Sequence, residues 1–535
     1  MNFKEKLEKE IKKQLNQEIS LRIPPSPEFG DFSLALFNQD LSKIKLKSNL
    51  IEKTEIKGGY LNIFIKKSRF IEETLKEINK DYGKTKSKQQ KILIEYPSPN
   101  TNKPLHLGHI RNILLGSTLT NLLKFQGNKV IQVNLNNDRG IHICKSMLAY
   151  KLWGNNKQPD KKSDHFIGDF YVMFAQRAKE NKQLETQAQE LLLKWEQGDK
   201  ETISLWKKMN DWALKGFNET YKKLDLKFDK EYYESSIYKE GKKIIEEGLK
   251  KGLFTKDEEN NIIIDLTKEG LGKKVLLRQD GTSIYITQDI YLAYLKEKEF
   301  HSDKSVYVVA SEQDYHFKVL FKILDILNIV PINKLYHFSY GMIELPTGKM
   351  KSREGNVVDA DDIINEVIIL SKKVIKEKNS KIKEIDRLSK VIGIGALRFF
   401  ILKYDAKRNF VYNPEESLSF EGETGPYVQY THARICSILK KSKFSSKIDY
   451  SRFNDQEFQL IKKMAEFPEV IKDSTLNYRP HVLCNYLIKL AQLFNNYYSK
   501  NEIKSSKERL LLASKTKQIL FTGLALLGIE APEFM

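Results

Sequence analysis

The segment between residues 91 and 123 constrains the fold more than any other part of this sequence. It begins with an apolar run at residues 92–94, within a stretch at residues 91–96 that is typical of a buried β-strand. Two prolines within residues 97–100 stop this run, and residues 106–109 (HLGH) then precede an amphipathic, helix-like stretch at residues 110–123. A strand, a turn and a helix in this order begin the nucleotide site of many α/β domains. The segment therefore predicts a parallel sheet covered by helices.

The remaining periodicity predicts three domains. Residues 3–15 have helical spacing and residues 59–65 alternate like a strand, which together indicate a small α+β domain. Further strands of the parallel sheet are expected at residues 130–133, 283–286 and 305–310. The pattern between about 141 and 270 is mainly helical and indicates an insertion. The expected domains are residues 1–85, residues 86–375 with the insertion at about 141–270, and a mostly helical domain at residues 376–535.

Net charge and cysteine content narrow the class of protein. The formal net charge of +20 and isoelectric point near 9.3 fit a nucleic-acid partner, but a lysine-rich compositional bias would give the same values. Cys144, Cys436 and Cys484 form no CxxC pair, which argues against a disulfide framework or a zinc site. No apolar run approaches the roughly 20 residues of a membrane span, and residues 1–17 lack a signal-type apolar segment. We expect a soluble, cytoplasmic protein.

The two histidines of residues 106–109 are candidates for phosphate binding. His106 and His109 are three residues apart at a helix start, so their rings point the same way. The helix N-terminus adds exposed N–H groups and the positive end of its dipole, and Gly108 allows a flat base or ribose to approach the backbone. The alternative is two surface histidines in a loop. The preceding strand and turn favour an ATP cradle.

A second cationic segment lies far along the chain, at residues 349–355 (KMKSREG). Lys349 and Arg353 are four residues apart, and Gly348 and Gly355 are possible hinges. Such a loop can close over a pyrophosphate leaving group and neutralise its developing charge. The alternative is an ordinary solvated charge run in a lysine-rich chain.

Both segments resemble the signatures of one enzyme class. Residues 106–109 resemble the HIGH signature, and residues 349–355 the KMSKS signature, of class I aminoacyl-tRNA synthetases. Four further stretches resemble the arginyl-tRNA synthetase family: residues 94–106 (IEYPSPNTNKPLH), 279–289 (QDGTSIYITQD), 310–314 (ASEQD) and 420–434 (FEGETGPYVQYTHAR). The resemblance spans roughly residues 20–535, which is nearly the whole chain.

The resemblance implies a fold and a reaction. The fold would be a Rossmann-like parallel-sheet catalytic domain with a helical insertion, a small α+β N-terminal domain that contacts tRNA, and an all-α anticodon-binding domain. The reaction would be arginine–tRNA ligation: ATP and L-arginine form arginyl adenylate and pyrophosphate, and the arginyl group passes to the 3′-terminal ribose of tRNA(Arg). Mg²⁺ would accompany the ATP, no zinc or protein-bound metal is expected, and the enzyme would act as a cytoplasmic monomer without a membrane partner.

The resemblance places the ATP site at both signatures. The implied catalytic residues are His106, His109, Lys103 and Lys349. The implied ATP-binding residues are His106, Gly108, His109, Lys349, Met350 and Arg353. Ser352 departs from the general KMSKS signature, which has a lysine at that position. The resemblance suggests that Lys103, just upstream of His106, supplies the missing charge.

An arginine pocket is implied by residues that match the family: Glu95, Asn100, Tyr285, Asp289 and Gln313. Carboxylates bind the planar guanidinium through paired hydrogen bonds, so we place the substrate side chain on Asp289. Glu95 would take the α-ammonium group, with Asn100 and Gln313 as neutral orienting groups. Asp289 has an alternative as a helix N-cap, and Tyr285 as a core aromatic. Residues 137–140 (NDRG) depart from the GDWG of many relatives, and the sequence gives no account of the effect.

The implied anticodon contacts are Tyr427, Tyr430, Arg434 and Met535. Tyrosine rings and arginine planes stack on unpaired bases, although tyrosines at helical spacing are often core residues. Two other functions remain open: a related enzyme with another amino-acid specificity, and a non-catalytic RNA-binding paralogue. The pocket carboxylates argue against the first, and the presence of His106, His109 and Lys349 argues against the second.

Overall fold

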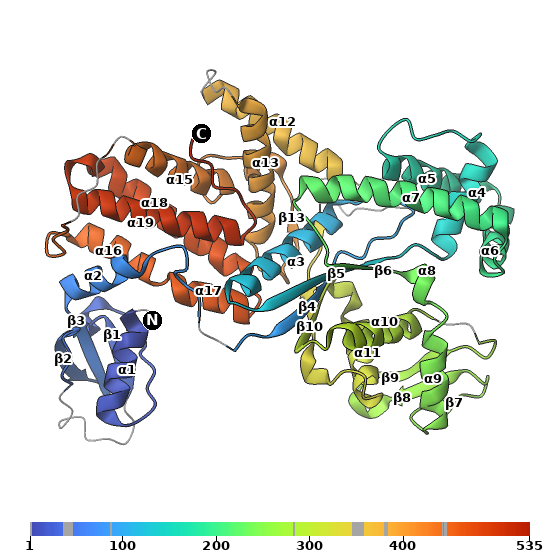
Figure 1. Ribbon diagram of the computed structural model, residues 1–535, viewed down its shortest axis with the longest axis horizontal. Coiled ribbons are helices and arrows are strands. Elements are labelled where there is room, and N and C mark those ends of the chain that lie inside the picture. The colour runs from blue at the N-terminus through green and yellow to red at the C-terminus, as the bar shows by residue number, and fades with distance from the viewer. Residues whose placement is uncertain are drawn as a thin grey trace. The chain divides into compact units, whose positions relative to one another are not determined.

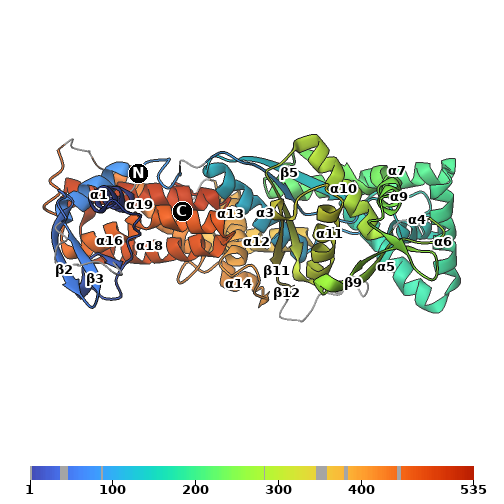
Figure 2. The ribbon, with the colours of Figure 1, turned by 90° about the horizontal axis from the view of Figure 1, so that it is seen from below.

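The structure is a computed structural model that describes residues 3–35, 46–85, 88–281, 284–344, 358–378, 384–440, 442 and 447–535. The chain forms two compact units, Lys86–Leu418 and the combination of Met1–Thr85 with Ser419–Met535. Figures 1 and 2 show the elements of each unit in two views. Within the described residues, no helix is both long and apolar enough to cross a membrane.

A five-stranded parallel sheet organises the unit Lys86–Leu418. Its strands, in spatial order, are β11 (Leu335–Tyr340), β10 (Lys304–Ala310), β4 (Lys91–Glu95), β5 (Lys129–Asn136) and β6 (Lys230–Tyr233). All neighbouring pairs run parallel. Strand β4 is central and almost wholly buried, which explains its unbroken apolar run. The predicted parallel sheet is confirmed, and so are the strands expected at residues 130–133 and 305–310.

Helix α3 (Leu107–Phe125) follows β4 and is buried on nearly all sides. The sequence indicated an amphipathic helix here, and this was wrong. Its polar residues face protein instead of solvent: Asn112 donates to the carbonyl oxygen of Val308 at 2.6 Å, and Arg111 donates to that of Gly341 at 2.6 Å. A Cβ atom on Gly116 would lie 2.6 Å from the Tyr96 ring, so this glycine lets α3 approach the end of β4 closely.

The expected helical insertion is present as four helices, with two additions that the periodicity did not reveal. The helices are α4 (Ile141–Trp153), α5 (Ser163–Glu180), α6 (Gln183–Glu196) and α7 (Lys200–Lys223). The additions are strand β6 of the parallel sheet and a small antiparallel sheet. The small sheet consists of β7 (Thr255–Lys256), β8 (Ile262–Leu266) and β9 (Gly272–Leu277). Two helices precede it in the chain, α8 (Glu234–Ile237) and α9 (Gly241–Lys250), and α9 contacts β9.

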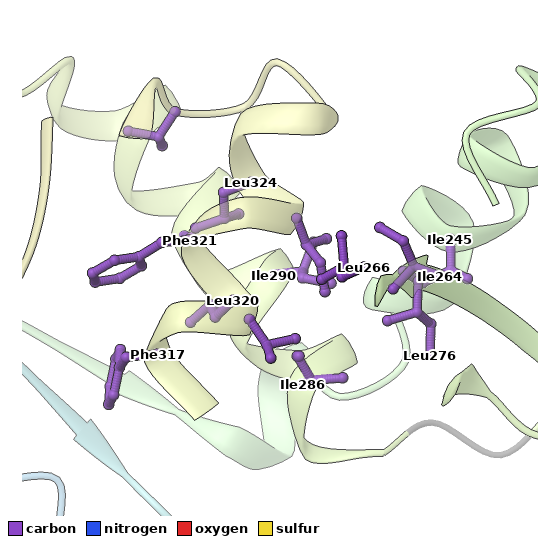
Figure 3. Packing of buried hydrophobic residues seen from close by; sticks show 14 of the residues in the cluster. Ile245, Ile264, Leu266, Leu276, Ile286, Ile290, Phe317, Leu320, Phe321 and Leu324 are labelled. Carbon is purple, nitrogen blue, oxygen red and sulfur yellow. The ribbon is translucent and has the colours of Figure 1, made fainter. Parts of the chain in front are cut away.

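The small sheet shares a hydrophobic core with the helices that follow it, α10 (Tyr285–Phe300) and α11 (Asp314–Ile326). Figure 3 shows Ile264 and Leu276 of the sheet near Ile286 and Ile290 of α10, with Leu320 of α11 beyond. A strand was expected at residues 283–286, but α10 begins at Tyr285. Short β-branched runs do not distinguish strand from helix, and here the core decided in favour of the helix.

The described part of this unit ends with three helices. They are α12 (Ala360–Lys378), α13 (Ile385–Leu402) and α14 (Pro414–Ser417), with short strands β12 (Ile343–Glu344) and β13 (Phe410–Val411). Helix α12 spans residue 375, so the expected domain boundary falls inside this helix. Helices α12 and α13 also pack against each other, and both contact α3. The three-domain division remains a prediction.

The other unit combines an α+β part with a helical part. Its antiparallel sheet has the order β1 (Phe32–Ala35), β3 (Tyr60–Ile65), β2 (Ile51–Lys57), with helices α1 (Phe3–Leu15) and α2 (Lys67–Glu77). The helical part contains α15 (Gly425–Lys440), α16 (Asp455–Ala465), α17 (Phe467–Leu476), α18 (Pro480–Lys500) and α19 (Lys507–Leu526). Both parts match the predicted fold class.

Candidate functional site

The two signature histidines cap the N-terminus of α3. His106 is the N-cap residue, and its Nδ1 accepts a hydrogen bond from the Gly108 N–H at 3.1 Å. Nδ1 of His109 accepts from the His106 N–H, also at 3.1 Å, and the ring centroids are 4.0 Å apart. Because both Nδ1 atoms act as acceptors, the proton of each neutral ring lies on Nε2. The pair therefore presents two N–H donors beside a helix N-terminus.

Burial determines the charge of this pair. Desolvation lowers the pKa of His106 to about 3, with a further lowering by the nearby Lys103. Desolvation also lowers the pKa of His109 well below its usual value, and His106 and Lys103 add to the effect. Both rings are therefore neutral at pH 7 and act as hydrogen-bond donors, not as cations.

The depressed pKa of His106 predicts a pH-dependent stability. The unfolded state takes up a proton on this ring near pH 6.5, whereas the folded state resists protonation down to about pH 3. The free energy of unfolding should therefore fall as pH drops from 6.5 towards 3. His106→Gln should reduce the slope of this fall in denaturant titrations at pH 7, 6 and 5. An unchanged slope would contradict the assignment.

The ATP-site residues are described only in part. Lys103 and His106 line a pocket of about 440 Å³ together with His165 and Asp359. Lys103 is thus beside the histidine pair, as the sequence suggested. The residues expected from the second signature, Lys349, Met350 and Arg353, lie outside the described residues, as does Ser352.

Glu95 ends β4 and has a partner that the sequence did not indicate. Its Oε2 accepts a hydrogen bond from Nζ of Lys296 in α10 at 2.6 Å, and both side chains are buried. The Lys296 ammonium also lies 4.2 Å from the centre of the Tyr307 ring. The ion pair and the cation–π contact compensate the desolvation of this lysine.

Removing one charge of this buried pair should destabilise the protein more than removing both charges. Lys296→Met should lower the free energy of unfolding by about 3–5 kcal/mol, because it leaves the Glu95 carboxylate buried without its counter-charge. The double variant Lys296→Met with Glu95→Gln should recover a large part of the loss, because it removes both charges. Chemical denaturation measures both values. A double variant no more stable than Lys296→Met would contradict the explanation.

Tyr285 and Asp289 lie one turn apart on α10, as a helical segment requires for a shared face. Asp289 is inside the helix, so it is not an N-cap, and Tyr285 is 72% exposed, so it is not a core aromatic. Oδ2 of Asp289 is 2.6 Å from Nε2 of His316 in α11, another partner that the sequence did not indicate.

Asn100 and Gln313 are the remaining residues of the expected arginine pocket. Asn100 follows β4, and Gln313 ends a short turn of helix (Ser311–Gln313) that follows β10. Both are exposed. Because β4 and β10 are neighbouring parallel strands, the structure brings Glu95, Asn100 and Gln313 to the same carboxyl edge of the sheet. Ligands of open α/β sheets bind at this edge.

Three of the four expected anticodon residues share a pocket in the other unit. Tyr430, Arg434 and Met535 line a cavity of about 650 Å³ together with Tyr498, whereas Tyr427 does not line it. The Arg434 guanidinium carbon lies 4.7 Å from the Tyr430 ring centre and 5.3 Å from that of Tyr498. Tyr430 is 36% exposed, so it is not a core residue.

Comparison with known proteins identifies the family. The family described as "tRNA synthetases class I (R), catalytic domain" matches residues 71–413, and the "DALR anticodon binding domain" matches residues 428–535. The chain belongs to the arginyl-tRNA synthetase family.

Individual relatives agree over almost the full length. The curated arginine–tRNA ligase of Treponema denticola is 44% identical over 567 aligned residues, covering 98% of this chain and 96% of the relative. That of Bacteroides thetaiotaomicron is 44% identical, covering 89% and 86%. The solved structure of the Thermus thermophilus arginyl-tRNA synthetase superposes with a TM-score of 0.87 at 25% identity, covering 100% of both chains.

Arg139, in the departure at residues 137–140, packs among aromatic side chains. The Arg139 guanidinium lies 3.9 Å from the ring centre of Tyr238 and 5.5 Å from that of Trp195, and it donates to Glu196 at 2.6 Å. Arg139 therefore packs the start of α4 against α6 and the residues after α8. A flat, cationic side chain can make these contacts where many relatives have a tryptophan.

Sequence reasoning missed four residues that contact or adjoin the candidate sites: Lys296, His316, Tyr498 and Glu234. Glu234 opens α8 and is buried, and desolvation raises its pKa to about 7, with Asp138 and Asp289 adding to the rise. None of the four lies in a stretch quoted for the family resemblance. The only available signal was their residue type, which is common elsewhere in the chain.

Proposed function

We propose that this chain charges tRNA(Arg) with arginine in two steps at the carboxyl edge of the parallel sheet. The arrangement of His106 and His109 carries the proposal, because it places two neutral N–H donors at the N-terminus of α3. A carboxylate oxygen of arginine attacks the α-phosphorus of ATP, and the bond to the pyrophosphate group breaks. A terminal ribose hydroxyl of the tRNA then attacks the adenylate carbonyl, which releases AMP.

Adenylate formation is assisted by groups that stabilise negative charge on the phosphates. Negative charge grows on the α-phosphate and on the departing pyrophosphate, where the Nε2–H groups of the histidines and the Lys103 ammonium provide donors. Gly108, Lys349, Met350 and Arg353 complete the proposed ATP site. Mg²⁺ would enter with the nucleotide, because this ion is usually held by phosphate oxygens and water in such sites. No covalent enzyme intermediate is needed, so catalysis rests on positioning and electrostatics.

Recognition of arginine is assigned to the two carboxylates. Asp289 binds the guanidinium, and Glu95, held by Lys296, binds the α-ammonium group. Tyr285, Asn100 and Gln313 orient the substrate. A neutral or acidic side chain could not form the charged pair with Asp289 that the guanidinium forms, which supports arginine over such substrates.

The proposed contacts with the anticodon belong to the other unit. Tyr430, Arg434 and Met535 would stack on and contact an anticodon base, with Tyr498 as an additional ring in the same pocket. Tyr427, which does not line this pocket, is a further candidate for contact with the anticodon. We assign residues 376–535 to anticodon binding and residues 1–85 to contact with tRNA outside the anticodon, and we expect a cytoplasmic monomer.

A charging assay tests the proposal. Purified protein, radiolabelled arginine, ATP–Mg²⁺ and tRNA(Arg) should give arginine bound to acid-precipitable tRNA, and omission of ATP should abolish the signal. Lysine, glutamate and glutamine in place of arginine serve as specificity controls. Binding of tRNA without charging would instead support a non-catalytic paralogue.

A further inference from the structure

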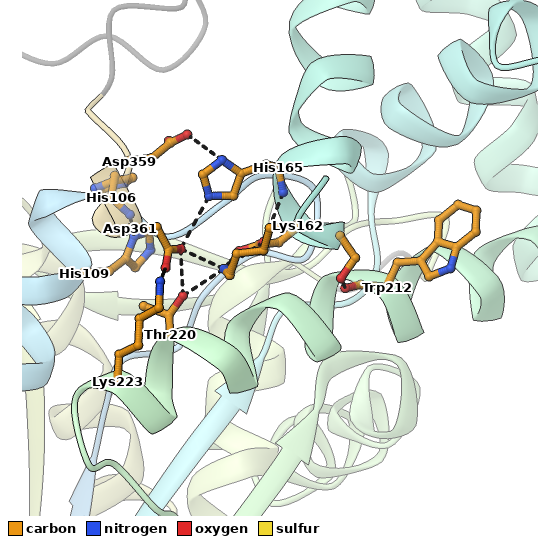
Figure 4. Close-up of polar contacts among 11 residues, drawn as sticks. His106, His109, Lys162, His165, Trp212, Thr220, Lys223, Asp359 and Asp361 are labelled. Carbon is orange, nitrogen blue, oxygen red and sulfur yellow. Dashed lines mark hydrogen bonds and ion pairs between the residues drawn. The ribbon is translucent and has the colours of Figure 1, made fainter. Parts of the chain in front are cut away.

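A network of buried and partly buried charged side chains joins the helical insertion to the start of α12 (Figure 4). His165 of α5 lies between two carboxylates: its Nδ1 is 3.2 Å from Oδ2 of Asp359, and its Nε2 is 3.4 Å from Oδ2 of Asp361. The hydrogen bond to Asp361 raises the pKa of His165 above its usual value. A protonated ring can donate to both carboxylates at once.

Lysines from the insertion complete the network. Nζ of Lys223 lies 2.6 Å from Oδ1 of Asp361, and Nζ of Lys162 lies 2.8 Å from its Oδ2. Lys162 is also 2.8 Å from Asp164. Asp164, His165 and Asp361 have the spacing of a metal site, but the Lys162 ammonium already bridges the two carboxylates. The cluster is therefore an ion-pair network, and Asp361 is held in it by Lys162, Lys223 and His165.

The backbone beside Asp359 is tied to the signature histidines. Asp359 forms an antiparallel bridge with His106, and the Ala360 N–H donates to the carbonyl oxygen of Leu105 at 2.8 Å. Asp359 and His165 both line the pocket that contains Lys103 and His106. In sequence, Asp359 follows the last residue of the second signature, Gly355, by four positions (359 − 355).

His165 also affects the charge of Asp359. Burial raises the pKa of this carboxyl to about 6, and the nearby His165 opposes the rise. Removal of the imidazole would therefore weaken both the contact and the ionised state of Asp359. The result would be a less constrained contact between Asp359 and His106 at the N-terminal end of α3.

We propose that His165 is a positioning residue for arginine activation, and that it acts through Asp359 and Asp361. By holding both carboxylates, α5 fixes Asp359 and the start of α12 against the N-terminal end of α3. It thereby holds His106 in the position from which its ring meets the nucleotide. This inference rests on the proposed function.

The test compares single and double variants in arginine-dependent ATP–pyrophosphate exchange with tRNA present. His165→Ala and Asp359→Asn should each lower kcat by about 10- to 100-fold, because small displacements of catalytic groups cost about this much. The KM for arginine should stay within about twofold, since the arginine residues lie on other elements. The double variant should lose no more than the more impaired single variant, because both changes break one contact.

Two further variants separate positioning from general damage. His165→Gln keeps one side-chain donor and should recover part of the kcat lost in His165→Ala. Lys179→Ala changes an exposed residue of the same helix and should behave as wild type. Any of three results would overturn the inference. The first is a double variant whose loss in kcat equals the product of the two single losses. The others are a wild-type kcat for His165→Ala and a kcat for His165→Gln no higher than that of His165→Ala. Absence of exchange in the wild-type protein would instead overturn the proposed function.

Discussion

Asp289→Ala should abolish arginine-dependent ATP–pyrophosphate exchange while leaving ATP binding nearly unchanged. The guanidinium would lose its charged partner in a site built to hold it. Truncation of one member of a hydrogen-bonded charge pair costs about 2–5 kcal/mol, which corresponds to a roughly 30- to 5,000-fold loss in kcat/KM for arginine. Steady-state exchange measures this loss, and ATP binding can be followed separately by calorimetry.

Controls on the same helix make this result specific. Asp289→Asn keeps the shape of the side chain but removes its charge, so it should remain strongly impaired. Glu299→Ala removes another carboxylate of α10, which pairs with Lys230 away from the proposed pocket, and should retain near-normal activity. An unchanged KM and kcat for arginine in Asp289→Ala would refute the pocket assignment.

The His316 contact adds detail to this prediction. His316 holds Oδ2 of Asp289 at 2.6 Å and thereby orients the carboxylate. A guanidinium can then use Oδ1, or share Oδ2 with the histidine. The carboxylate is therefore oriented before arginine arrives, which lowers the cost of binding.

Lys103→Ala should slow adenylate formation severely. The second signature has Ser352 in the place of a lysine, so a cation must reach the phosphates from elsewhere. Lys103 lines the same pocket as His106 and is close enough to lower the pKa of that ring. Removal of one donor to a developing oxyanion costs about 10²–10³ in rate, and we expect a loss of this size in single-turnover arginine activation.

The substitution Ser352→Lys supplies a stringent control for Lys103. If the two positions deliver charge to the same phosphates, Ser352→Lys in the Lys103→Ala background should restore a measurable part of the rate. Lys124→Ala removes an exposed lysine from the opposite end of α3 and should have little effect. Near-normal activation by Lys103→Ala would refute the compensation.

Local sequence patterns predicted the elements of the site well. The strand, turn and helix at residues 91–125 appear as expected, because apolar runs, prolines and helix starts act over a few neighbouring residues. The patterns failed where tertiary packing chose between two local structures. A strand was expected at residues 283–286, but Tyr285 and Ile286 begin α10, because Ile286 and Ile290 pack into the core that the small sheet shares.

The sequence by itself determined the family, the parallel-sheet fold and the residue types of the candidate sites. Only the tertiary structure decided which charges those residues meet. Glu95 and Lys296 are 201 positions apart, and His165 and Asp361 are 196 apart. No local sequence pattern predicts such pairs, because they form only when strands and helices from distant parts of the chain pack together. The low dielectric of that packed interior makes each pairing, or its absence, energetically important.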